Sequence, residues 1–256
     1  MLDIQHTKQQ SNIILNRPEQ GNALTESMLI ELSEAFNNLP KTSKILTISA
    51  NGKHFCAGAD LNWMRQAKDL SEKENLASAQ LLFNMYLALY NCSIPVITHV
   101  QGAVMGGALG LVACSDIVIA QDNAFFSLSE AKLGIVPATI SPFVIQKLGY
   151  SQFLALSLQA RKFTAQEALS YGLIHSCITG KDQSKKVFDV TCEDTLNNSP
   201  YALKIIKQLS RKYLSFKPEN FAQSTSELIA KCRVSYDGQE GLNAFFEKRK
   251  PQWGKV

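Results

Sequence analysis

Apolar positions along the chain follow two periods, and each period predicts a different kind of element. Short, mostly apolar runs at 44–50, 95–100 and 116–120 are typical of strands that are buried on both faces of a sheet. Between 25 and 39 the apolar residues recur every three or four positions, which predicts a helix with one buried face. Residues 2–16 have the pattern of a strand pair. Strands and helices therefore alternate over roughly the first 180 residues, and this order indicates an α/β fold.

Hydroxyl and acidic residues mark the positions where several helices begin. Ser71 and Glu74 have the spacing of a capping box, in which each side chain accepts a hydrogen bond from the other residue's backbone N–H. This box predicts the start of a long helix, and Thr164 with Glu167 predicts the start of a shorter one. Thr25 is a suitable N-cap for the first helix, because its hydroxyl can accept a backbone N–H in the first turn.

The chain after Lys181 has helical patterns only. A last strand is predicted at 173–178, and Ser199 followed by Pro200 is a typical helix start. The helices predicted in this tail lie at 200–213, 219–233 and 238–247. Because no low-complexity linker separates the tail from the α/β part, we expect its apolar faces to pack against other protein surface.

Composition excludes several classes of protein. The 256 residues are 45% hydrophobic and 19% charged, as in ordinary soluble globular proteins. The 26 Lys and Arg residues exceed the 22 Asp and Glu residues by only four, and the basic residues are scattered. The densest basic group, at 248–250, is too short to form a nucleic-acid-binding tail, so we expect no nucleic-acid partner.

Cysteine and histidine positions indicate neither a metal site nor a disulfide framework. The six cysteines form no CxxC pair, and the four histidines are isolated from them and from one another. Cysteines in such apolar contexts are typical of buried side chains in a reducing compartment. No apolar run approaches the ~20 residues of a membrane span, and the N-terminus has no signal-peptide core. We therefore expect a cytoplasmic protein without a membrane partner.

Two glycine-containing loops connect a buried strand to an amphipathic helix. The first is TISANGKHFCAGADLNWM, at 47–64, and the second is PVITHVQGAVMGGALGLVACSD, at 95–116. Small residues let a ligand approach the backbone closely, and a helix that starts there has unpaired N–H groups. Two such N–H groups could stabilise one developing negative charge, as an oxyanion hole does. Close helix–sheet packing and phosphate binding explain the same residues, although neither loop matches a nucleotide-binding motif.

Five segments resemble the enoyl-CoA hydratase/isomerase (crotonase) family, and together they span essentially the whole chain. They are LNRPEQGNALT, HFCAGADLNWM, QGAVMGGALGLVACSDIVIA, FFSLSEAKLGIVP and EGLNAFFEKRKPQW. The second, third and fourth are most similar to the methylglutaconyl-CoA hydratase branch, which acts in leucine catabolism. The resemblance implies an α/β fold built as a crotonase-like spiral of ββα repeats. It further implies a core at 1–195 and a helical region at 196–256 that builds trimers, which commonly stack into hexamers.

The resemblance also implies a site for an acyl-CoA substrate and no cofactor. The backbone N–H groups of Ala59 and Gly107 would hold the thioester oxygen, and Ala23 would touch the adenine region through its backbone. Phe245 and Lys248 match C-terminal positions that reach the CoA, often across a subunit contact. The full set of implied substrate contacts is Ala23, Ala57, Gly58, Ala59, Asp60, Leu61, Asn62, Gly106, Gly107, Phe245 and Lys248.

The chain departs from the family pattern at one catalytic position. The hydratases of this family usually supply two glutamates, and the first is replaced here by Gly110. The second matches Glu130, whose apolar neighbours in sequence predict a raised pKa suited to proton exchange near neutral pH. Hydration of an α,β-unsaturated thioester by Glu130 is the favoured activity. Double-bond isomerisation with one base, and a catalytically weak acyl-CoA-binding or scaffold protein, are the alternatives.

Three nearby side chains have competing interpretations. Cys56 lies in the first loop beside Ala57 and Gly58 and is a nucleophile candidate by proximity, but nothing nearby lowers its pKa, so packing is favoured. Arg65 or Lys132 could pair with a substrate carboxylate if the substrate is methylglutaconyl-CoA, and both equally fit a solvated face.

Overall fold

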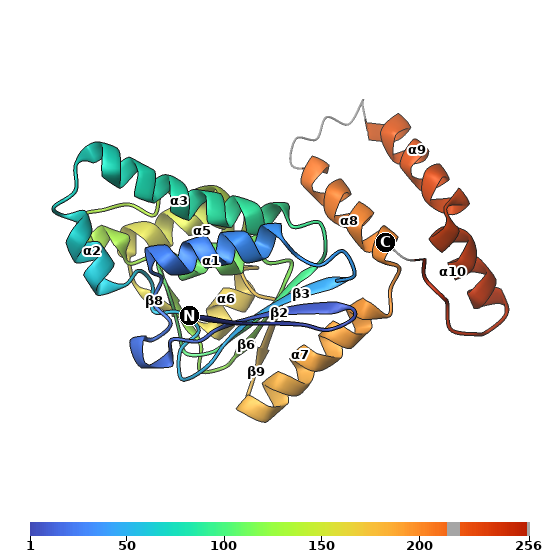
Figure 1. Cartoon of the computed structure of the whole chain (residues 1–256), viewed down its shortest axis with the longest axis horizontal. Helices are drawn as coiled ribbons and strands as arrows, with labels where there is room; N and C mark the ends of the chain where they lie inside the picture. Colours follow the sequence, from blue (N-terminus) through green and yellow to red (C-terminus); the bar gives the residue numbers. More distant parts are fainter. Residues whose placement is uncertain (214–220, 255–256) are drawn as a thin grey trace.

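The computed structural model describes residues 1–213 and 221–254, and its main feature is a twisted sheet of six strands (Figure 1). The first two strands are antiparallel and all the other pairings are parallel. In spatial order the strands are β1 (Leu2–His6), β2 (Gln10–Leu15), β3 (Ile45–Ala50), β4 (Val96–Val100), β6 (Ile117–Gln121) and β9 (Ser176–Ile178). The strand pair predicted at 2–16 and the strands predicted from apolar runs are thereby confirmed.

A second sheet of three short strands positions the candidate site. Its strands are β5 (Ala103–Met105), β7 (Phe125–Ser127) and β8 (Lys162–Thr164), with β5 and β7 parallel. Met105 pairs with Ser127, so both strands end at the same edge. The N–H of Gly106 then donates to the carbonyl oxygen of Ser127 over 2.9 Å. The glycine loop after β5 and the segment that contains Glu130 after β7 therefore leave the sheet together.

The predicted helix starts are confirmed by their capping hydrogen bonds. Helix α1 (Glu26–Asn37) begins after Thr25, whose hydroxyl accepts the N–H of Met28. Helix α3 (Glu72–Asn91) and helix α6 (Ala165–Ser170) each begin with a complete capping box. Helices α1 and α3 pack against each other over one face of the main sheet (Figure 1).

Helix α5 (Ser141–Gln159) is absent from the expectations based on sequence. Gly149 interrupts it with a left-handed φ of 74°, so two helical segments meet at a kink. A kink resets the angular position of the side chains, so no single period of apolar residues runs through the whole helix. The short helix α2 (Leu61–Ala67) follows the first glycine loop.

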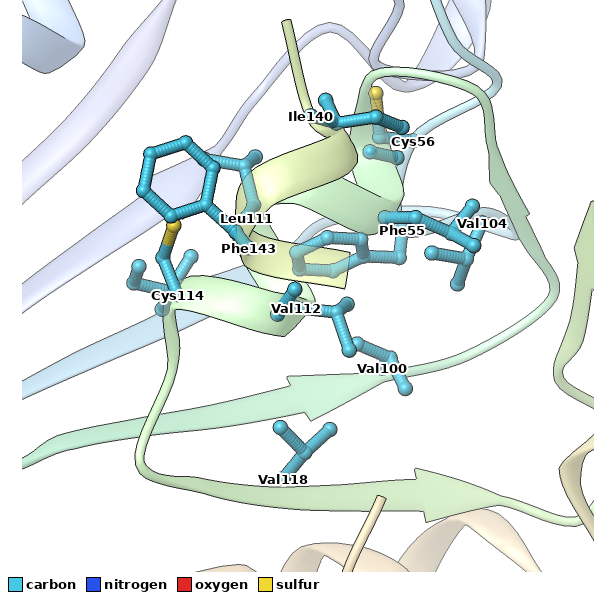
Figure 2. Packing of buried hydrophobic residues seen from close by; sticks show 14 of the residues in the cluster. Phe55, Cys56, Val100, Val104, Leu111, Val112, Cys114, Val118, Ile140 and Phe143 are labelled. Atoms are coloured by element: carbon cyan, nitrogen blue, oxygen red, sulfur yellow. The ribbon is translucent and has the colours of Figure 1, made fainter. Parts of the chain in front are cut away.

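Helix α4 (Ala108–Cys114) passes through the centre of the core, and all its residues are buried. Val112 of α4 points toward Val100 of β4, and Val118 of β6 continues this apolar layer (Figure 2). The second glycine loop, which leads into α4, is therefore anchored to the buried core. Buried apolar packing of this kind holds the adjacent backbone in one conformation.

The helical C-terminal region contains α7 (Lys181–Leu196), α8 (Pro200–Tyr213), α9 (Phe221–Val234) and α10 (Tyr236–Phe246). The predicted start of a helix at 219 lies outside the described residues. Helices α9 and α10 pack against each other and stand apart from the main sheet (Figure 1). Helix α10 exposes Phe245 and Phe246 almost completely. The division into 1–195 and 196–256 and the assembly into trimers remain predictions.

Helix α8 is attached to the core by polar contacts. The ammonium of Lys207 donates to the carbonyl oxygen of Ile94 over 2.7 Å and pairs with Asp116 over 2.6 Å. Asp116 also accepts the N–H of Val96 over 2.7 Å, so one carboxylate joins α8 to the start of β4. Within the described ranges, no helix has the length and apolar character needed to cross a membrane.

Candidate functional site

The two glycine loops predicted from sequence lie side by side. Cys56 of the first loop forms a parallel bridge with Val104 of the second, and the N–H of Met105 donates to the carbonyl oxygen of Cys56 over 3.1 Å. Gly58 has a φ of 102°, and a methyl group built on it would lie 3.2 Å from the carbonyl oxygen of Met105. A left-handed conformation and this close approach both favour glycine at position 58.

Ala59 and Gly107 present backbone N–H groups that have no acceptor in the described part of the chain. Leu24 contacts the chain at both positions. Its backbone accepts the N–H of Asp60 and donates to Gly58, which fixes the peptides on both sides of Ala59. A methyl group built on Gly107 would lie 3.2 Å from Cδ1 of the same leucine. The two predicted oxyanion donors therefore both lie next to one residue, Leu24.

Asn22 connects the N-terminal segment to the first loop, a role that the sequence analysis missed. It has a left-handed φ of 54°, a conformation that asparagine tolerates better than most residues. Its side-chain oxygen accepts the N–H of Arg17, and its amide nitrogen donates to the carbonyl oxygens of Asn51 and His54. This network places Ala23 beside the loop, and the substrate contact implied for Ala23 stays a prediction. The signal in the sequence was the Gly21-Asn22 pair, which is typical of a left-handed turn.

The carboxylate of Asp60 has a structural role, because it caps α2 and pairs with Arg17. One oxygen accepts the N–H of Asn62 over 2.9 Å as the N-cap of α2, and the other pairs with Arg17 over 3.3 Å. Burial alone would raise the pKa of Asp60, but these bonds from Asn62 and Arg17 outweigh it and lower the pKa below its usual value. Asp60 therefore stays ionised and positions the loop. The next residue, Leu61, is 76% exposed and is free to contact a ligand.

Glu130 begins a short 3-10 helix, η2 (Glu130–Leu133), and its carboxylate faces the second glycine loop. A methyl group built on Gly106 would lie 3.3 Å from Oε1 of Glu130. Oε2 is buried and has no hydrogen-bond partner among the described residues. Burial raises the pKa of Glu130 above the ordinary 4.5, although a backbone hydrogen bond lowers it slightly. A half-buried carboxyl group with a raised pKa is suited both to accept and to return a proton.

Position 110, where the family pattern has its first glutamate, is closed by packing. A methyl group built on Gly110 would lie 2.6 Å from Cε1 of Tyr86 and 2.7 Å from Cγ2 of Ile140. Both of these side chains are fully buried. The surrounding core therefore leaves no room for a carboxylate at position 110. Glu130 faces the loop without a second carboxylate from that position.

The remaining candidates fall into two groups. Ala57 and Asn62 lie on the surface of the first loop, whereas Phe245 and Lys248 lie at the end of α10, away from both loops (Figure 1). Within one chain the C-terminal pair is therefore not part of the site. Burial raises the pKa of Cys56 to about 12, which agrees with its interpretation as a packing residue.

Two side chains considered for a substrate carboxylate are available to solvent. Arg65 on α2 and Lys132 in η2 are both exposed. No group of three or more potential ligands for a metal ion occurs within the ranges that the structure describes.

Comparisons with known proteins agree on one family. The sequence model of the enoyl-CoA hydratase/isomerase family matches residues 8–256. The crystal structure of an enoyl-CoA hydratase from Shewanella pealeana ATCC 700345 is 41% identical, with a TM-score of 0.91 over 98% of this chain and 95% of that one. A putative enoyl-CoA hydratase from Thermus thermophilus is 28% identical, and the match covers 94% of this chain and 96% of the relative.

A relative with a different named activity matches to a similar degree. The peroxisomal Delta(3,5)-Delta(2,4)-dienoyl-CoA isomerase of Arabidopsis thaliana is 29% identical over 260 residues, which cover 96% of this chain and 92% of the relative. The structural match confirms the fold expected from the sequence, and the named activities divide between adding water and moving a double bond.

Proposed function

This chain belongs to the enoyl-CoA hydratase/isomerase family, and from that premise we propose that it adds water to an α,β-unsaturated acyl-CoA thioester. The observation that carries the proposal is the position of Glu130, whose half-buried carboxylate faces Gly106, the residue before Gly107. The solved structure that is 41% identical to this chain is named an enoyl-CoA hydratase, which supports hydration over isomerisation.

The proposed mechanism uses two backbone donors and one carboxylate. The N–H groups of Ala59 and Gly107 bind the thioester oxygen and stabilise the negative charge that develops there as water adds to Cβ. Glu130 in its ionised form takes a proton from the attacking water, and the resulting carboxylic acid returns a proton to Cα. The proton that Glu130 removes from water is the one that it returns to Cα, so the reaction needs no cofactor.

Isomerisation is the second candidate, and the packing around Gly110 favours it. Tyr86 and Ile140 leave no room for a second carboxylate at that position. A single base is enough to remove a proton from one carbon and return it to another, with the same enolate bound by the same two N–H groups. A protein that binds acyl-CoA without turnover would need the same loops but no ionisable Glu130.

The identity of the acyl group is a finer part of the proposal. We propose methylglutaconyl-CoA, an intermediate of leucine catabolism, as the substrate, and Arg65 or Lys132 as the partner of its free carboxylate. Both cations are exposed. Arg65 lies on α2, which follows the first glycine loop, and Lys132 lies in η2, which begins at Glu130. The proposal extends to a cytoplasmic trimer or hexamer, in which Phe245 and Lys248 of a neighbouring subunit reach the CoA.

One assay separates the candidates. The absorbance of the conjugated thioester falls when water is added, whereas it rises when an unconjugated enoyl-CoA is isomerised. We expect a decrease with methylglutaconyl-CoA and a slower decrease with crotonyl-CoA. An increase with an unconjugated enoyl-CoA, with no change for the other two, would replace hydration by isomerisation. No change with any of the three would mean that the protein is not an enzyme of this class.

The pH dependence of the reaction should report Glu130. As a base, Glu130 must be ionised, and burial raises its pKa above 4.5. The value of kcat/KM should therefore decrease as the pH falls through this raised pKa, so that the acidic limb lies above 4.5. Measuring kcat/KM from below pH 4.5 up to pH 8 tests this expectation. An acidic limb at or below the ordinary glutamate value would contradict the role given to Glu130.

A further inference from the structure

Tyr86 is the largest of the fully buried side chains, and nothing in the proposed mechanism uses it. It lies on α3, whereas every proposed catalytic group lies on a loop that follows a strand. Its hydroxyl donates to the carbonyl oxygen of Gly107 over 2.6 Å. A tyrosine buried in a core usually places its hydroxyl on a partner, and here the partner is the proposed oxyanion residue.

The backbone at this point has little intrinsic stiffness. Gly106 and Gly107 are consecutive, and Gly106 has a left-handed φ of 51°. Glycines lose more conformational freedom on folding than any other residue, so neighbouring contacts must fix the direction of the Gly107 N–H. On one side, the N–H of Gly106 donates to Ser127 over 2.9 Å. On the other side, the carbonyl oxygen of Gly107 accepts the Tyr86 hydroxyl and the N–H of Gly110.

The ring of Tyr86 packs against the first turn of α4, beside Gly107 and Gly110. Methyl groups built on Gly107 and Gly110 would lie 2.8 Å from the Tyr86 hydroxyl oxygen and 2.7 Å from its Cζ. The same ring therefore contacts both the proposed donor position and the position of the missing glutamate. Burial, with smaller effects from Cys56, Cys114 and Glu130, raises the pKa of Tyr86 well above its usual 10. The hydroxyl thus remains a neutral donor throughout the working range of pH.

We infer that Tyr86 is a positioning residue, which aims the Gly107 N–H at the thioester oxygen and occupies the space that a second carboxylate would need. This inference rests on the proposed function, because it assumes that Gly107 binds an oxyanion. It applies equally to hydration and to isomerisation, since both reactions pass through an enolate on the same oxygen. Tyr86 does not touch the substrate, because it has no exposed surface.

The test compares Tyr86→Phe with Tyr90→Phe, which lies one turn later on the same helix. The Tyr90 hydroxyl accepts a hydrogen bond from Gln146 over 3.2 Å, outside the site. For Tyr86→Phe we expect kcat to fall about tenfold with KM changed less than twofold, because the donor is misaligned but not removed. Tyr90→Phe should retain the wild-type kcat and KM.

A binding measurement distinguishes positioning from a general loss of structure. Acetoacetyl-CoA can bind as an enolate with charge on the thioester oxygen, whereas butyryl-CoA carries no such charge. Tyr86→Phe should weaken acetoacetyl-CoA about tenfold and leave the affinity for butyryl-CoA unchanged. An equal weakening of both ligands, or no change in either, would overturn the inference alone. If wild-type protein bound neither thioester, the proposed function would fall and the inference with it.

Discussion

Replacing Glu130 with glutamine should remove turnover while leaving the affinity for a saturated acyl-CoA within about twofold of wild type. Glutamine keeps the size of the side chain but cannot exchange a proton, and a positioned acid or base contributes roughly 10²–10⁴-fold to rate. The two N–H groups that bind the thioester oxygen are unaffected by the change. Steady-state kinetics and butyryl-CoA titration measure the two effects separately. Turnover within tenfold of wild type would remove Glu130 from the mechanism.

Stability provides the control for this variant. A carboxyl group whose pKa is raised in the folded state favours the protonated form there, so its ionisation destabilises the fold as the pH rises above 4.5. Glu130→Gln removes that ionisation, and the variant should be at least as stable as wild type at pH 7. A lower melting temperature would show that the loss of activity came from misfolding. The expected combination is a protein of equal or higher stability that does not turn over substrate.

Introducing the missing glutamate should damage the protein instead of improving it. In Gly110→Glu the new Cβ would lie 2.6 Å from Tyr86 and 2.7 Å from Ile140, and its charge would be placed in a buried helix. Overpacking a core and burying an unpaired charge together cost about 3 kcal/mol or more. We expect a decrease of this size in the free energy of unfolding, measured in urea, with no gain in kcat. Gln208→Glu, at an exposed position of α8, is the matched control and should have no measurable effect.

The double variant Tyr86→Ala/Gly110→Glu tests whether the tyrosine ring is the obstacle. Removing the ring opens space beside position 110, so the two substitutions should be less destabilising together than the sum of their separate effects. Strict additivity would mean that Ile140, or the buried charge alone, closes the position. In that case the packing of Tyr86 would not explain why the chain has a glycine there.

The parts of the fold that depend on local chemistry were predictable from the sequence. Capping boxes at Ser71 and Thr164 located two helix starts, because the hydrogen bonds that begin a helix are made by residues close in sequence. The small sheet was largely missed, since strands of three residues are too short to show a period. Helix α5 was missed because Gly149 divides its pattern.

Some residues of the candidate site could be predicted from the sequence, and others could not. The two loops were identified from small residues between a strand and a helix, whereas the role of Glu130 was found through its resemblance to a family motif. Tyr86 was not found, because a buried aromatic residue in a long helix gives the same apolar pattern whether it supports a core or a site. Its contacts with Gly107 and Gly110 join positions more than 20 residues apart, and only the folded chain brings them together.

The closed position at Gly110 has a stereochemical consequence for the proposed hydration. With acid and base functions combined in one side chain, the hydroxyl group and the hydrogen must both arrive from the side of the planar double bond that faces Glu130. The addition is therefore syn, and a product formed in heavy water would carry its deuterium at Cα on the same face as the new oxygen at Cβ. The filling of one small space by Tyr86 and Ile140 would in this way fix the configuration at Cβ and, in heavy water, also at the deuterated Cα.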